Sequence, residues 1–151
     1  MCWADDLIID GIPNIKGTIQ INGNANISKS NFDIVHGGVG EREAIEFPEL
    51  NESLMERYRQ TVMAEGNYYE DDTFPLIISG TTFVDSDVNI MGNIAISGNG
   101  ILVVNGDLAI HGNTKIISDK AGALVFVVKG DVIISGNESL ECVFFTEGNL
   151  R

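Results

Sequence analysis

Clusters of acidic side chains are the first candidates for chemistry in this sequence. Three carboxylates adjoin at residues 70–72 in YYEDD, and DSDVN spaces Asp85, Asp87 and Asn89 like the opening of a calcium-binding loop. Hard cations prefer such grouped oxygen ligands. Isoleucines occupy the positions where an EF-hand requires glycine and glutamate, so DSDVN is not an EF-hand. We expect a solvated acidic surface, with a cation-stabilised binding module as an alternative.

Histidines offer the other usual catalytic groups. His36 lies in the glycine-rich HGGVG and His111 in GDLAIHGN, and neither has a cysteine or a second histidine nearby in the sequence. HGGVG lacks the glycine spacing of a phosphate loop, so we expect a flexible turn there. A carbohydrate-active or acyl-transferring β-helix enzyme would instead require Asp107, Asp131 and His111 to converge on one outer face. Three candidate lysines are scattered along the chain: Lys115, Lys120 and Lys129.

Composition narrows the classes of partner. The chain has 151 residues, enough for one domain with a sizeable core, and its 22 acidic and 9 basic residues give a net charge of −13. Nucleic acids are bound through Lys and Arg, so this excess argues against a nucleic-acid partner. No apolar run approaches the roughly 18 residues of a membrane span. The opening MCWADDLIIDG does not resemble a signal peptide, and Cys2 and Cys142 are expected to be thiols rather than part of a disulfide framework.

An eight-residue unit recurs four times. The copies are GTIQINGN (17–24), GNIAISGN (92–99), GDLAIHGN (106–113) and GDVIISGN (130–137), and a truncated copy ends the chain. Alternating aliphatic residues predict half-buried strands, and Gly-Asn or Gly-Asp pairs favour sharp corners. Short strands, frequent turns and internal repetition are typical of a β-solenoid.

We therefore predict an all-β fold, namely a right-handed β-solenoid (parallel β-helix). The solenoid forms one domain over residues 1–151. Its first coils are expected at 6–35 and its main coils at 76–150. The opening glycines are spaced by 75, 14, 24 and 18 residues, which indicates coils of variable length. The closing amides are expected to stack as a ladder at one corner. They are Asn24, Asn99, Asn113 and Asn137.

A helix is predicted between the first copy and the others. Apolar residues at helical spacing favour a helix over 51–65, opened by a capping box of Ser53 and Glu56 and ended by Gly66. Residues 41–72 hold 10 acidic and 3 basic side chains, which fits a solvated helix face. Because solenoid ends expose strand edges, we expect this helix to cover an end or a flank, with a surface insertion as the alternative.

Three C-terminal stretches carry a resemblance to a known family: ILVVNGDLAIHGN, ALVFVVKGDVIISGN and VFFTEGNL. They follow an acidic, tyrosine-containing segment, YYEDDTF, and then LIISGTTFVDSDVNIMGN. This part of the chain resembles the C-terminal region of bacterial PilX-like proteins associated with type IV pilus assembly. The resemblance covers residues 67–150 and implies an envelope-exposed, non-enzymatic module. In such proteins an N-terminal hydrophobic helix anchors the module, and this sequence has no such helix. A weaker resemblance is to bactofilins, cytoskeletal β-solenoids that polymerise.

These features predict a non-enzymatic structural or adhesive module, at the bacterial cell surface or extracellular, and associated with a pilus. The alternatives are a polymer-forming cytoskeletal solenoid and the β-helix enzyme described above. We expect no catalytic, cofactor-binding or metal-binding residue and no cofactor. Because the last copy stops within its motif, we expect an open C-terminal edge that pairs with another chain or with surface and pilus proteins.

Overall fold

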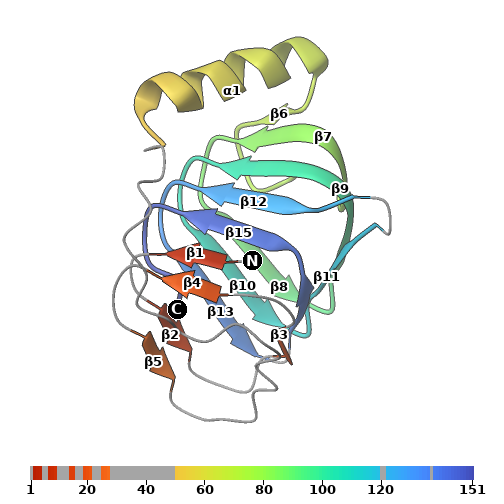
Figure 1. Ribbon diagram of the computed structural model, residues 1–151. Helices are drawn as coiled ribbons and strands as arrows, with labels where there is room; N and C mark the ends of the chain where they lie inside the picture. Colours follow the sequence, from red (N-terminus) through yellow and green to blue (C-terminus); the bar gives the residue numbers. More distant parts are fainter. Residues whose placement is uncertain are drawn as a thin grey trace.

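The computed structural model describes residues 50–119, 122–136 and 138–151 in full, together with the backbone of five short N-terminal strands. These are β1 (Cys2–Ala4), β2 (Leu7–Ile9), β3 (Asn14–Ile15), β4 (Ile19–Ile21) and β5 (Ala25–Ile27). The chain forms stacked coils of parallel strands with one helix, α1 (Glu52–Glu65), at one end of the stack (Figure 1). The predicted all-β solenoid with one flanking helix is confirmed.

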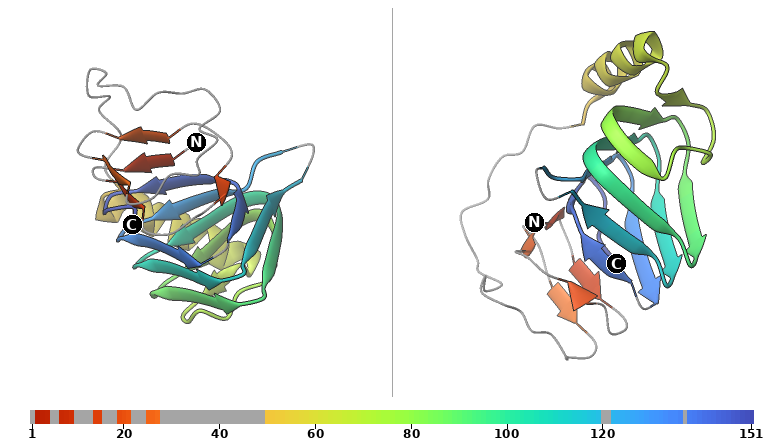
Figure 2. Two further views of the ribbon diagram at one scale, coloured as in Figure 1. Left: turned by 90° about the horizontal axis from the view of Figure 1, so that it is seen from below. Right: turned by 90° about the vertical axis from the view of Figure 1, so that its right-hand side faces the viewer.

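The main coils contain ten further strands. They are β6 (Tyr68–Tyr69), β7 (Ile77–Val84), β8 (Val88–Gly92), β9 (Ala95–Val104), β10 (Leu108–Gly112), β11 (Lys115–Ser118), β12 (Val125–Val128), β13 (Val132–Gly136), β14 (Ser139–Glu141) and β15 (Val143–Thr146). Neighbouring coils stack these strands into three faces around a common core (Figure 2).

The three faces are named here by their strands. Face A stacks β6, β7, the second half of β9, β12, β15, β1 and β4 in that order. Face B stacks β8, β10 and β13. Face C stacks the first half of β9, β11, β14 and β3. The remaining strands, β2 and β5, pair with each other.

Coil length varies along the stack. Val88 is in register with Leu108, Leu108 with Val132, and Val132 with Leu150, so successive coils take 20, 24 and 18 residues. The prediction of coils of unequal length is therefore confirmed.

The similar eight-residue units do not share one place in the coil. Residues 106–113 and 130–137 carry the strands of face B, where β8 of the preceding coil completes the stack. Residues 92–99 lead into face C, and residues 17–24 include β4 of face A. Aligning all four copies as equivalent was wrong, because alternation identifies a half-buried strand without specifying which face it forms.

The prediction that Asn99 and Asn113 stack in one asparagine ladder is wrong. Asn113 donates from Nδ2 to Oδ1 of Asn93 at 3.1 Å, one coil away. Asn99 lies at a different corner, in register with Ser79. The other two predicted members, at positions 24 and 137, lie outside the residues whose side chains are described.

Aliphatic and aromatic columns fill the interior. On face A, Leu102, Phe126 and Phe144 are in register in successive coils, and the two phenyl ring centroids are 5.1 Å apart. These three side chains are at most 2 % exposed. Burying each one contributes about 2 kcal/mol of hydrophobic free energy. Because these side chains contact one another from coil to coil, the coils share a continuous apolar core.

Helix α1 begins and ends by standard capping. The side chain of Asn51 accepts the N–H of Leu54, so the helix opens with an asparagine cap rather than with the predicted capping box of Ser53 and Glu56. Gly66 ends the helix with φ 76°, as predicted. The buried face of α1 packs on the outward side chains of face A, so α1 covers a flank of the first coils.

The N-terminal strands continue the stack beyond the C-terminal coil. Cys2 is in register with Phe144, and Asn14 with Ser139, so β1 and β3 occupy the edges of β15 and β14. Figure 1 shows β1 and β4 directly below β15. The prediction of an open C-terminal edge was wrong, because the opposite end of the same chain supplies the next coils.

Candidate functional site

The two acidic residues of DSDVN point to different partners. Asp85 faces helix α1, whereas Asp87 accepts the main-chain N–H of Asp107 at 2.9 Å. Asn89 is exposed on face B. Residues 50–119, 122–136 and 138–151 contain no group of three or more His, Cys, Asp or Glu side chains placed to hold a metal ion.

Asp85 is the centre of a polar cluster between α1 and the first coils. Its carboxylate accepts hydrogen bonds from the Tyr68 hydroxyl and the Asn105 amide, both at 2.7 Å, and forms an ion pair with Arg59. Partial burial raises the pKa of Asp85, but the hydrogen bonds from Asn105 and Tyr68 and the positive charge of Arg59 outweigh it. The pKa of Asp85 is therefore held below its ordinary value.

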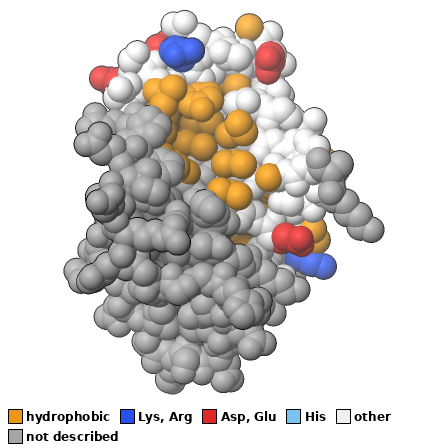
Figure 3. All heavy atoms as spheres, viewed as in Figure 1, with side chains coloured by type: hydrophobic (Ala, Val, Ile, Leu, Met, Phe, Trp, Pro, Cys, Tyr) orange, Lys and Arg blue, Asp and Glu red, His pale blue; other side chains and the backbone are white. Residues whose placement is uncertain are grey.

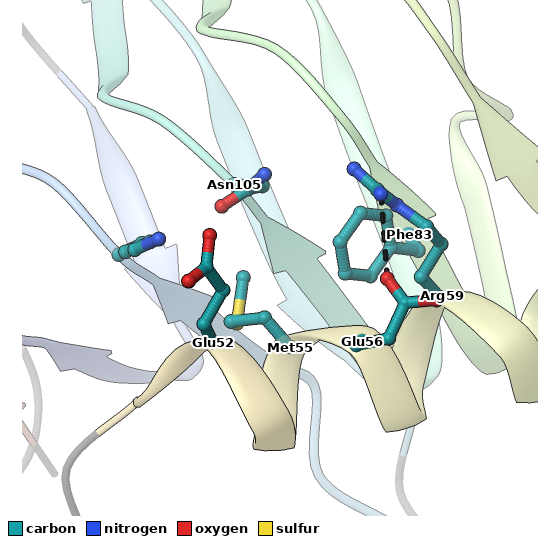
Figure 4. Close-up of a pocket in the computed structure, with 7 residues that line it drawn as sticks. Glu52, Met55, Glu56, Arg59, Phe83 and Asn105 are labelled. Atoms are coloured by element: carbon teal, nitrogen blue, oxygen red, sulfur yellow. Dashed lines mark hydrogen bonds and ion pairs between the residues drawn. The ribbon is translucent and has the colours of Figure 1, made fainter.

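The Asp85 cluster borders a cavity of about 100 Å³ between α1 and the strand ends of face A (Figure 4). Arg59 pairs with Glu56 at 3.3 Å and lies 5.9 Å from the centroid of the Phe83 ring. The other lining residues are Glu52, Met55, Asn105 and Lys129. The ion pair of Arg59 with Asp85 beside this cavity joins the helix to the coils.

A second polar column runs down the corner that precedes face B. Asp107 accepts the N–H of Asp131 at 2.8 Å, and Asp131 accepts the N–H of Asn149 at 2.8 Å. Asp87 accepts the main-chain N–H of Asp107 in the same way. Each of these three carboxylates therefore accepts a hydrogen bond from the backbone of the next coil. The recurrent acidic residue of the repeat therefore joins neighbouring coils.

The three residues required by the carbohydrate-active alternative do not converge. Asp107 and Asp131 lie at the entrance to face B, whereas His111 follows Asp107 by four positions along β10, a distance of roughly 13 Å. Nδ1 of His111 is in hydrogen-bond contact with the Ser135 hydroxyl of the next coil. Lys115 opens β11, Lys129 lines the cavity beside α1, and His36 and Lys120 lie outside the described residues.

The acidic run after α1 forms an exposed turn. Oδ1 of Asp71 accepts hydrogen bonds from the main chain and hydroxyl of Thr73, and these bonds lower the pKa of Asp71. Glu70 and Asp72 are exposed beside it. The carboxylates of 70–72 are therefore solvated, as predicted.

Glu138 is a buried carboxylate that the sequence pattern did not identify. Its side chain is only 3 % exposed, and neither carboxylate oxygen has a hydrogen-bond partner among the described residues. Burial raises the pKa of Glu138, whereas its own main-chain N–H and the nearby His111 act in the opposite direction. Glu138 follows a Gly-Asn corner, where the pattern suggested only a turn.

Face A also carries outward-facing apolar side chains that the sequence analysis did not single out. Helix α1 covers Phe83, Val103 and Val127. Next to them lies a half-buried group, here called the outer strip, which is visible as hydrophobic surface in Figure 3. The outer strip consists of Ile101, Val125, Val143 and Phe145. Uninterrupted apolar runs such as ILVV and LVFVV were the available signal.

Compared with known proteins, this chain matches no family model, no curated protein and no solved structure. Within the described residues, no helix has the length and apolar character needed to cross a membrane.

Proposed function

We propose that this protein is a non-enzymatic structural or adhesive module that attaches to a pilus or another surface protein at the bacterial cell surface. The outer strip is the observation that carries the proposal. Val125 and Val143 are in register in neighbouring coils, and Ile101 continues their column toward α1. Adjacent apolar side chains on the surface of a rigid body favour attachment to a partner.

The other faces differ from face A in their outward positions. On face B the outward positions are mixed: Met91, Ala109 and Ile133 are apolar, whereas Asn89, His111 and Ser135 are polar. Such polar positions are what water-facing strands require. Face A alone carries an unbroken aliphatic column at these outward positions, whereas those of face B are mixed, and this difference supports face A as the attachment face.

A matched pair of substitutions tests this proposal. Val125→Lys places a charge in the outer strip, and Ile133→Lys places the same charge at a half-buried outward position of face B. The measurement is the fraction of each protein that sediments with pili and envelope after cell fractionation, with melting curves confirming that both variants fold. We expect Val125→Lys to lower that fraction several-fold and Ile133→Lys to leave it unchanged. Equal retention of both variants, or a wild-type protein found only in the cytosol, would contradict the proposal.

A polymer-forming cytoskeletal solenoid is the second candidate. Among the described strands, β4 and β8 each have a single neighbour, so each leaves one edge without a described strand, at opposite ends of the stack. Exposed parallel edges can pair with another solenoid. Filaments of stacked protomers in electron micrographs of the purified protein would favour this candidate over attachment through face A.

A further inference from the structure

The strand pairs β15–β1 and β14–β3 form a seam between the two ends of the chain. Phe144 is in register with Cys2, and Ser139 with Asn14. These pairs are parallel, like those between the preceding coils. The chain does not run from β15 into β1, so strand pairing, and not the continuity of the chain, places these strands side by side.

The covalent path from the N-terminal coils to the rest of the protein passes through residues 28–49. From β4 to β7 the stack rises by five strand steps, which at about 4.8 Å each is roughly 24 Å. The 22 residues of this connection can reach roughly 70 Å when extended. The connection is therefore long enough to let the N-terminal strands meet the same edge of another molecule.

We propose that the edge formed by β14 and β15 is an exchangeable docking site that accepts β1 and β3 of a second copy of this chain. The exchanged dimer contains the same backbone pairs as the closed monomer, so exchange loses no strand contact. Tethering gives the cis strands an effective concentration of the order of mM. Closed monomers therefore prevail in dilute solution, and exchanged dimers form where copies are crowded together.

The closed seam also includes an unfavourable desolvation free energy, that of the buried Glu138 carboxylate, which opening the seam would remove. Glu138 directly precedes Ser139, the residue of β14 that pairs with β3. Glu138 is only 3 % exposed, and neither carboxylate oxygen has a hydrogen-bond partner among the described residues. A buried polar group without a partner favours states in which water reaches it. Opening the seam beside Glu138 would let water reach this carboxylate.

Cross-linking between two differently substituted copies tests the exchange. One copy carries Asn14→Cys and the other Ser139→Cys, and both carry Cys2→Ala and Cys142→Ala. Register partners on neighbouring strands lie about 4.8 Å apart, within the range of a disulfide. The copies are mixed reduced, at about 1 mM and at a concentration about a hundredfold lower, and are then oxidised.

We expect a covalent heterodimer on a non-reducing gel, far more abundant at the higher concentration. The matched control replaces Ser139→Cys with Thr61→Cys on the exposed side of α1 and should give only background cross-linking. A single chain carrying both Asn14→Cys and Ser139→Cys should close an internal disulfide in dilute solution. An internal disulfide without heterodimer above background would overturn the exchange, and failure to form the internal disulfide would overturn the seam itself.

Discussion

Oδ1 of Asp107 accepts the main-chain N–H of Asp131 at 2.8 Å, one coil away. The same oxygen would lie 2.0 Å from a Cβ atom at Gly130. The Gly-Asp pair therefore has a physical meaning: glycine leaves room for the carboxylate of the neighbouring coil, and that carboxylate fixes the backbone of the next aspartate. In the first coil Ser86 stands before Asp87 at the corresponding position.

This relationship predicts strong coupling between Gly130 and Asp107. Gly130→Ala should lower the free energy of unfolding by about 2 kcal/mol, because the new methyl group displaces the Asp107 carboxylate. Asp107→Ala should cost about 1 kcal/mol through loss of the hydrogen bond. The double variant should cost clearly less than the sum of the two, as measured by urea denaturation. Additive costs would show that the two residues do not share this contact.

The solenoid could be predicted from the sequence because the repeat contains both the alternation of a half-buried strand and the Gly-Asn or Gly-Asp pairs of a sharp corner. Alternation around Ile96 and Ile110 marks strands with one buried side, and both side chains are fully buried. The order of the coils could not be predicted in this way. Pairing of Cys2 with Phe144 depends on contacts between distant parts of the chain, which no local pattern encodes.

The Asp85 cluster predicts an acid-sensitive attachment of α1. Asp85→Ala should lower the free energy of unfolding at pH 7 by about 2 kcal/mol, because Tyr68, Asn105 and Arg59 lose their shared acceptor. The folded-state pKa of Asp85 lies below its unfolded value, so its contribution is present above the unfolded pKa and is lost as the pH falls through the folded pKa.

Urea denaturation at pH 7 and at acid pH measures this effect. The difference between Asp85→Ala and the wild type should shrink as the pH falls. Asp72→Ala, which removes an exposed carboxylate of the nearby turn, serves as the control and should change stability little at either pH. A penalty for Asp85→Ala that stays constant into the acid range would exclude the charged cluster as its source.

Two glycines with positive φ should respond very differently to alanine. Gly98 has φ 132°, and a Cβ there would lie 2.0 Å from the carbonyl oxygen of Ile78. Gly92 has φ 94° but open space around it. Gly98→Ala should cost about 3 kcal/mol, against about 1 kcal/mol for the conformational strain of Gly92→Ala. Thermal melting of the two variants measures the difference, and equal melting temperatures would contradict the close approach of β7 and β9 at this bend.

The proposed attachment face and the buried Glu138 were harder to predict than the fold. Val125 and Phe126 are adjacent in LVFVV, yet one faces outward and the other lies fully buried in the core. An uninterrupted apolar run does not show which side faces the core or whether a helix covers the other. Glu138 likewise occupies a corner, and only the packing of neighbouring coils removes its carboxylate from water.

Glu138 predicts a pH dependence opposite in sign to that of Asp85. Burial raises its folded-state pKa above the unfolded value, so the stability that it contributes is fully present below the unfolded pKa and is lost as the pH rises through the folded pKa. Glu138→Gln keeps the shape of the side chain without a titrating charge. It should match the wild type in free energy of unfolding near pH 4 and become the more stable protein as the pH rises toward 8.

Urea denaturation across this pH range separates that prediction from a general charge effect. Glu141→Gln removes an equal charge from an exposed position three residues away. That control should give a nearly constant difference from the wild type, because its carboxylate is solvated. If Glu138→Gln and Glu141→Gln follow the same curve, the Glu138 carboxylate is not buried in solution. If only Glu138→Gln gains stability with rising pH, ionisation of this one side chain weakens the coil edge on which β3 packs.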